Sequence, residues 1–167
     1  TDATDWADIT LARSEPAGCS SATYGYTIGG NPTTDVIDKF PFASQTNASD
    51  VGNLLSGKGG GGSASSTLTY GYSHGGYPLG NVLQKFSFTT DGNATDVADM
   101  VHDPAANIAS AAGTSSTAYG YSSGGGPYIP GGGVWNWISK YSHTTDANST
   151  DVGDLTVGRR NMQGTHY

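Results

Sequence analysis

The sequence repeats itself: one unit of roughly 45–55 residues is written three times and then begun again. Its clearest block is rich in tyrosine and glycine and occurs at 24–30, 70–76 and 119–125 as YGYTIGG, YGYSHGG and YGYSSGG. Self-similarity of this kind is typical of repeat architectures, whose units bury their apolar surface against one another. The repeat therefore constrains the fold more strongly than any other feature of the chain.

Two further blocks follow the first in fixed order. One occupies 36–42, 82–88 and 137–143 (VIDKFPF, VLQKFSF and WISKYSH), and its approximate apolar alternation predicts a strand with one buried face. The other is a polar turn leading into a short strand, at 47–51, 93–97 and 148–152 (NASDV, NATDV and NSTDV). A fourth copy of this turn opens the chain at 2–6 as DATDW.

The composition favours strands over helices. The chain has 26 Gly and 10 Tyr among its 167 residues, charged residues make up 13%, and Lys and Glu are scarce. Aromatic residues that recur in register argue against a disordered linker. With three or four short strands in each unit, the sequence predicts an all-β fold built of kelch-like β-propeller blades.

The number of copies is unusual for a closed ring. A half unit at 1–26 and units at about 27–72, 73–121 and 122–167 form one repeat array over 1–167, or about 3.5 units. Closed propellers have roughly four to eight blades. We therefore expect a homo-oligomer, other proteins or sequence outside this segment to complete the fold. An open β-solenoid and a trimeric β fibre are the alternatives.

The order of blocks resembles the kelch family of propeller repeats. A kelch blade has a Gly-Gly doublet, here Gly29-Gly30, then a strand with an apolar–x–x–aromatic pattern, here Ile37 to Phe40. Trp6 stands at the position of the kelch tryptophan, and Arg13 and Arg159 stand at that of the kelch arginine. Valine replaces the tryptophan in the three later copies, so the match is to the pattern and not to every residue.

A more specific resemblance covers nearly the whole chain. The run DANSTDVGDLTV at 146–157 is similar to repeats in virion-associated fibre proteins of marine bacterial viruses. This resemblance implies a non-enzymatic structural or adhesion segment of a virion fibre, appendage or decoration protein, located on the virion or outside the cell. Its partners would be further copies, other virion proteins or a host surface glycan. The alternative is a secreted or cell-surface bacterial carbohydrate-binding propeller module.

Charge and cysteine content exclude several other classes. The formal net charge of −7 leaves no basic stripe for nucleic acid, and no apolar run is long enough to insert into a membrane. Cys19 is the single cysteine, so an internal disulfide is impossible. The four histidines occupy unmatched positions of the repeat and form no recurring catalytic or zinc pattern, so we expect no enzyme and no cofactor.

The acidic turns are one candidate site. Asp91, Asn93, Asp96 and Asp99 place several oxygen ligands within nine residues, as calcium favours, and a similar set follows Asp146. The same residue types also form Asx turns that close hairpins, and this structural interpretation is the stronger one. Calcium is therefore a secondary hypothesis.

The loop in which the copies differ most is the other candidate. The third unit inserts GPYIPGGGVWNW at 126–137, where the first unit has only 31–36. Function on a repeat scaffold is commonly carried by such variable loops. Tyr128, Trp135 and Trp137 are the predicted ligand-binding residues, since aromatic rings stack on sugars; packing within the array is the alternative, above all for Trp137, which aligns with Val36 and Val82.

Overall fold

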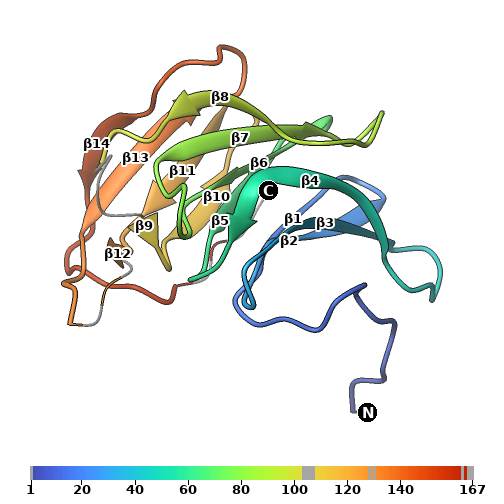
Figure 1. The fold of residues 1–167 in the computed structure, drawn as a ribbon. Helices are drawn as coiled ribbons and strands as arrows, with labels where there is room; N and C mark the ends of the chain where they lie inside the picture. Colours follow the sequence, from blue (N-terminus) through green and yellow to red (C-terminus); the bar gives the residue numbers. More distant parts are fainter. Residues whose placement is uncertain (1, 103–107, 128, 130, 163, 165–167) are drawn as a thin grey trace.

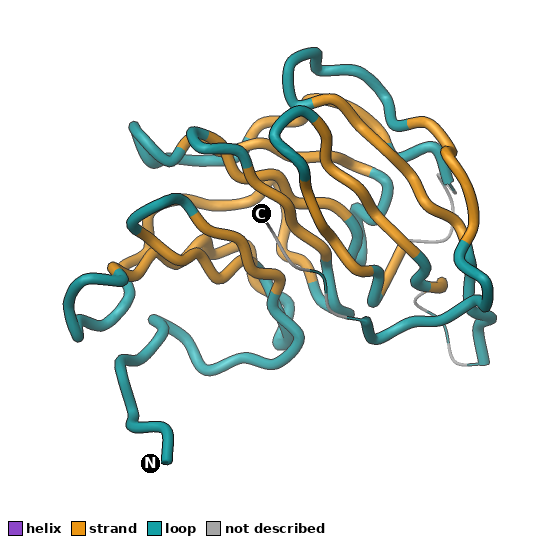
Figure 2. The backbone as a smooth tube through the Cα atoms, turned by 180° about the vertical axis from the view of Figure 1, so that it is seen from behind, coloured by secondary structure: helices purple, strands orange, loops and turns teal. Residues whose placement is uncertain are grey.

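The computed structural model describes residues 2–102, 108–127, 129, 131–162 and 164. Within these residues the chain forms fourteen strands, and every strand pairing is antiparallel. Figure 2 shows strands and loops but no helix in this part of the chain. This confirms the predicted all-β class. Accordingly, no helix in the described part of the chain could cross a membrane.

Three four-stranded sheets make up most of the fold (Figure 1). Sheet 1 contains β1 (Ala17–Ser20), β2 (Tyr24–Ile28), β3 (Thr34–Pro41) and β4 (Ser49–Lys58), in that order. Sheet 2 contains β5 (Ser63–Ser66), β6 (Tyr70–His74), β7 (Val82–Ser87) and β8 (Thr95–Asp99). Sheet 3 contains β10 (Ala112–Ser115), β11 (Tyr119–Ser123), β13 (Trp137–Ser142) and β14 (Thr150–Asp154). A two-stranded pair, β9 (Ile108–Ala109) and β12 (Gly126–Pro127), lies beside sheet 3.

The sheets meet along their first strands. β5 lies against β1 on one side and against β10 on the other, so sheet 2 is placed between its neighbours (Figure 1). Each core is shared by two sheets. The first joins sheets 1 and 2 and includes Tyr26, Ile37 and Phe88, and the second joins sheets 2 and 3 and includes Tyr72 and Tyr141. Each sheet therefore depends on a neighbour to bury its apolar face.

The sequence blocks correspond to particular strands. The tyrosine–glycine blocks form β2, β6 and β11, and the apolar–aromatic blocks form β3, β7 and β13. The Gly-Gly doublet ends the second strand of each sheet in left-handed backbone, as at Gly29 (φ 60°) and Gly30 (φ 122°). Glycine adopts this conformation without a steric penalty, which explains why the doublet recurs.

The turns before the fourth strands of sheets 2 and 3 are fastened to the preceding sheet. Asn93 accepts a hydrogen bond through Oδ1 from the backbone N–H of Asn53 (3.0 Å), and Ala94 N–H donates to the carbonyl of Asn53 (2.8 Å). Between sheets 2 and 3, Asn148 accepts in the same way from the N–H of Asp99 (3.0 Å). The recurrent asparagine thus links neighbouring sheets.

Repeated ion pairs join the same sheets. The Lys39 ammonium lies 2.9 Å from the carboxylate of Asp91, and the Lys85 ammonium lies 2.7 Å from that of Asp146. Each lysine also lies over a tyrosine ring of its own sheet. These pairs are partly exposed, so we expect each to contribute less than about 1 kcal/mol and to act mainly in alignment.

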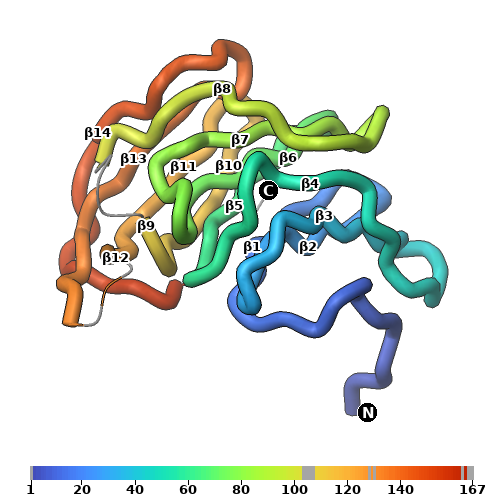
Figure 3. The backbone as a smooth tube through the Cα atoms, in the orientation of Figure 1, coloured from blue at the N-terminus to red at the C-terminus, as the bar shows by residue number. Residues whose placement is uncertain are grey.

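The amino-terminal segment 5–13 covers the outer side of sheet 1 (Figure 3). The N–H of Asp8 donates to Asn47 Oδ1 (3.1 Å). The N–H groups of Asn53 and Asp99 donate in the same way to the matching asparagines of sheets 2 and 3. Thr10 Oγ1 donates to Asp38 Oδ1 (2.6 Å), and Arg13 forms a fully buried ion pair with the same carboxylate (2.8 Å). The segment therefore takes the place of a preceding fourth strand.

Candidate binding pocket

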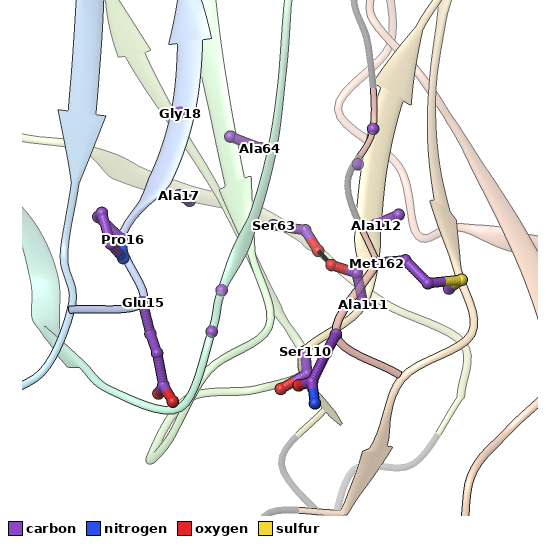
Figure 4. A pocket seen from close by; sticks show the side chains of 15 residues that line it. Glu15, Pro16, Ala17, Gly18, Ser63, Ala64, Ser110, Ala111, Ala112 and Met162 are labelled. Carbon is purple, nitrogen blue, oxygen red and sulfur yellow. Dashed lines mark hydrogen bonds between the residues drawn. The ribbon is translucent and has the colours of Figure 1, made fainter. Parts of the chain in front are cut away.

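A central pocket lies where the first strands converge (Figure 4). Its volume is about 350 Å³, and its walls come from four stretches of chain that occupy matching positions of the repeat: 15–18, 61–64, 110–113, and 161, 162 and 164. Small residues predominate, and one wall contact is fixed by Ser63 Oγ, which donates to the carbonyl of Ala111 at 2.6 Å. The pocket is therefore a product of the repeat geometry itself.

Four matching residues with left-handed backbone surround one end of this pocket. They are Glu15 (φ 55°), Gly61 (φ 69°), Ser110 (φ 56°) and Asn161 (φ 59°). The first three each lie two positions before a first strand, and Asn161 follows sheet 3. Figure 4 shows the side chains of Glu15 and Ser110 at the same end of the pocket. Glycine fits this backbone without strain, whereas the other residues bear a cost of about 1 kcal/mol or more.

A second pocket continues outward from the same end. Its volume is about 400 Å³, and it shares Glu15, Ser110 and Asn161 with the central pocket. Arg160 adds a guanidinium, and Ile129 adds an apolar side chain that is 61% exposed. The described part of the inserted loop 126–137 contributes Gly126, Pro127 and Ile129 to this wall.

The chemistry of this pocket end suits recognition of a polar molecule. Glu15 supplies hydrogen-bond acceptors, Arg160 supplies a fork of donors, and Asn161 supplies both. Ile129 and Pro127 offer apolar contact beside them. A few convergent polar groups on an apolar wall are typical of small-molecule binding sites.

The opposite end of the fold is hollowed as well. Three matching hairpins surround a space of about 560 Å³ there and contribute Ser21, Thr67 and Ser116. Each of these hydroxyl oxygens accepts a hydrogen bond from the backbone N–H three residues later. Since these hydroxyl oxygens already accept hydrogen bonds within their own turns, this end offers fewer groups for a ligand.

The predicted aromatic residues lie in sheet 3 and beside it. Trp135 and Trp137 are half-buried and stack on each other with ring centroids 4.6 Å apart. His102 stacks on Trp137 at 4.1 Å, and Trp135 packs against the core between sheets 2 and 3. Trp137 thus lies between two rings, which favours packing over sugar stacking. Tyr128 lies outside the described residues.

Two buried polar side chains, Lys58 and His74, lie away from the pocket. Lys58 Nζ and both ring nitrogens of His74 are buried without a hydrogen-bond partner. Burial lowers the pKa of Lys58 from 10.5 to about 7. Burial, reinforced by the charge of Lys58, lowers the pKa of His74 from 6.5 to about 3. Neither residue lines the central pocket or its outer continuation.

The acidic turns are used to join sheets. Asp91 and Asp146 pair with lysines, and the Oδ1 atoms of Asn93 and Asn148 accept backbone hydrogen bonds. In the described residues, no group of three or more His, Cys, Asp or Glu side chains is placed to hold a metal ion. The structural interpretation of these turns therefore has direct support from their contacts.

No family model matches this sequence, and no curated protein sequence matches it.

Sequence reasoning missed the residues at the pocket end. Glu15, Ser110 and Asn161 stand at positions that match Gly61, the glycine that precedes the first strand of sheet 2. They lie between the recurring blocks, in stretches where the copies differ in sequence and length. The signal that the sequence offered was a polar residue at three of four matching positions, where the fourth position has a glycine.

Proposed function

We propose that the three sheets are kelch-like propeller blades and that the chain is a non-enzymatic adhesion segment of a virion fibre, appendage or decoration protein. The arrangement of the strands supports the propeller: each sheet has four antiparallel strands, and the first strands together surround the central pocket. The resemblance of 146–157 to fibre-protein repeats supports the virion setting.

One observation supports adhesion through a surface glycan. The inserted loop of sheet 3, the part in which the units differ most, forms a wall of the pocket that also contains Glu15, Arg160 and Asn161. A carboxylate, a guanidinium and an amide beside an apolar wall match the hydroxyl groups and the C–H faces of a sugar ring. The binding residues would then be Glu15, Arg160 and Asn161, with Trp135 and Tyr128 as the contributions expected from the sequence.

The test is binding of the whole chain to an array of cell-surface polysaccharides and oligosaccharides. We expect selective binding that weakens about tenfold or more in Glu15→Gln and in Arg160→Gln, because a hydrogen bond to a charged group contributes about 1.5–3 kcal/mol. Asp96→Asn is the matched control, since Asp96 is exposed and lies outside the pocket.

Two results would contradict the glycan proposal. One is a blank array with protein whose circular dichroism spectrum and unfolding transition show that it is folded. The other is an equal loss of binding in the Asp96→Asn control and in the pocket variants.

A further inference from the structure

The open side of sheet 3 matches a surface that the same chain presents on sheet 1. Each fourth strand covers the sheet that follows it, as β4 covers sheet 2 and β8 covers sheet 3. β14 is exposed at all five of its residues, and in the described structure no sheet follows it. At the other side, the described residues that cover sheet 1 are those of segment 5–13.

Segments 5–13 and 151–159 share the residues that hold sheet 1. The first reads DWADITLAR and the second DVGDLTVGR, so Asp, Asp, Thr and Arg recur at the same four positions. In segment 5–13, the threonine and the arginine are the two residues that bond Asp38. Segment 151–159 has Thr156 and Arg159 at those positions, and both are exposed.

The corresponding stretch of β4 does not have this pair. Residues 50–58 read DVGNLLSGK, with Leu55 and Lys58 where the other two segments have Thr and Arg. The sheet that β4 covers has Gln84, an uncharged residue, at the position of Asp38. Segment 151–159 is therefore complementary to a sheet that carries a buried aspartate, and in this chain that sheet is sheet 1.

We infer that two copies of the chain join head to tail: segment 151–159 of one copy covers sheet 1 of the other and displaces its segment 5–13. Residues 161, 162 and 164 of the first copy, which lie beside β10, then give up that place to 15–18 of the second copy. Arg159 then pairs with Asp38 of the second copy, and Thr156 bonds the same carboxylate. The exchange is favoured because segment 151–159 is joined to a whole sheet, so that docking also buries the open side of sheet 3.

Two such joints close a ring. Each copy contributes the three four-stranded sheets of its described residues, so two copies give six, which lies within the range of four to eight blades that closed propellers have. The inference rests on the propeller arrangement proposed above and is independent of glycan binding. A chain that binds no sugar is still expected to form this joint.

The first experiment traps the joint with cysteines. Chains with Asn47→Cys are mixed with chains with Asp154→Cys under mild oxidation, while the native Cys19 is buried and stays unreactive. We expect a disulfide-linked species of twice the chain mass from the mixture. Asp154→Cys mixed with Asn93→Cys is the matched control, because Asn93 is already covered by β4 of its own chain.

A second control tests the geometry. Asp8→Cys and Asn47→Cys in one chain are expected to form a bridge within that chain, because the Asp8 N–H donates to Asn47 Oδ1. Failure of the 47–154 bridge while this internal bridge forms would overturn the inference. Equal bridging of position 154 to positions 47 and 93 would also overturn it.

The second experiment measures mass in solution by light scattering over a range of concentrations. We expect a two-chain particle that dissociates at least tenfold more readily in Arg159→Glu. Thr90→Glu, which adds a negative charge to an exposed turn of sheet 2, should leave association unchanged. A chain that stays a monomer at all concentrations contradicts the proposed joint. So does a dimer whose dissociation is the same in Arg159→Glu as in the native chain.

Discussion

Arg13 and Lys58 occupy the same position of the repeat but have different environments. Arg13 meets the carboxylate of Asp38, and both side chains are fully buried. The residue of sheet 2 that matches Asp38 is Gln84, which offers no charge to Lys58. Burial without a counter-charge disfavours the ammonium form, which is why the pKa of Lys58 falls to about 7.

This difference gives the contact between β4 and sheet 2 a distinctive pH dependence. In the unfolded chain Lys58 binds a proton up to pH 10.5, whereas in the folded chain it releases that proton near pH 7. The unfolded state then binds more protons between these values, so stability rises with pH through this window. The slope is limited to about 1.4 kcal/mol per pH unit.

We expect Lys58→Met to remove that rise. In the native chain the free energy of unfolding should increase by up to about 1.5 kcal/mol between pH 7 and 8.5, and in the variant it should stay nearly flat. Urea unfolding at several pH values measures the difference. Lys85→Met is the control, because Lys85 is partly exposed and paired with Asp146, so it should keep the native slope.

At the scale of the strand, one glycine in each sheet supports an aromatic ring. A Cβ built on Gly25, Gly71 or Gly120 would clash with an aromatic ring of the neighbouring third strand. For Gly71 this ring is that of Phe86, which is 3% exposed and packs against Tyr26 of sheet 1. The glycine therefore lets the ring lie flat on the strand and reach the core between the sheets.

Gly71→Ala should destabilise the chain by about 1–3 kcal/mol, because the ring must leave its position and the core loses contacts. Thermal and urea unfolding provide the measurement. Gly133→Ala is the matched control: a Cβ at that position meets nothing within 4 Å, so a change below about 0.5 kcal/mol is expected there. Equal losses of unfolding free energy in the two variants would show that the contact with the Phe86 ring is not the cause of the destabilisation.

The strands were largely predictable from the sequence, since the blocks at 24–30, 36–42 and 47–51 overlap β2, β3 and β4. Alternation and turn residues act locally, and sequence reveals such effects directly. The role of Gly71 was not predictable, because it depends on Phe86 crossing from the next strand. The pocket end was missed for a similar reason: Glu15, Ser110 and Asn161 come together only through the packing of the sheets.

At the scale of the whole molecule, each sheet is stabilised mainly by its neighbours. Sheet 2 has a core on both sides, shared with sheet 1 and with sheet 3. Sheet 3 has one such core, and its last strand is exposed at every residue. In arrays of this kind, stability is close to a sum of the stability of each unit and that of each interface between neighbours.

The exposed edge of sheet 3 therefore sets where the native chain opens first. Amide hydrogen exchange in dilute protein should be fastest along β14, intermediate in β13, and slowest in β6, by at least tenfold between the extremes. Mass spectrometry of peptic fragments resolves these regions. Uniform exchange across all three sheets would contradict such local opening. If a second copy docks on this edge at higher concentration, exchange along β14 becomes slower while exchange in β6 changes little.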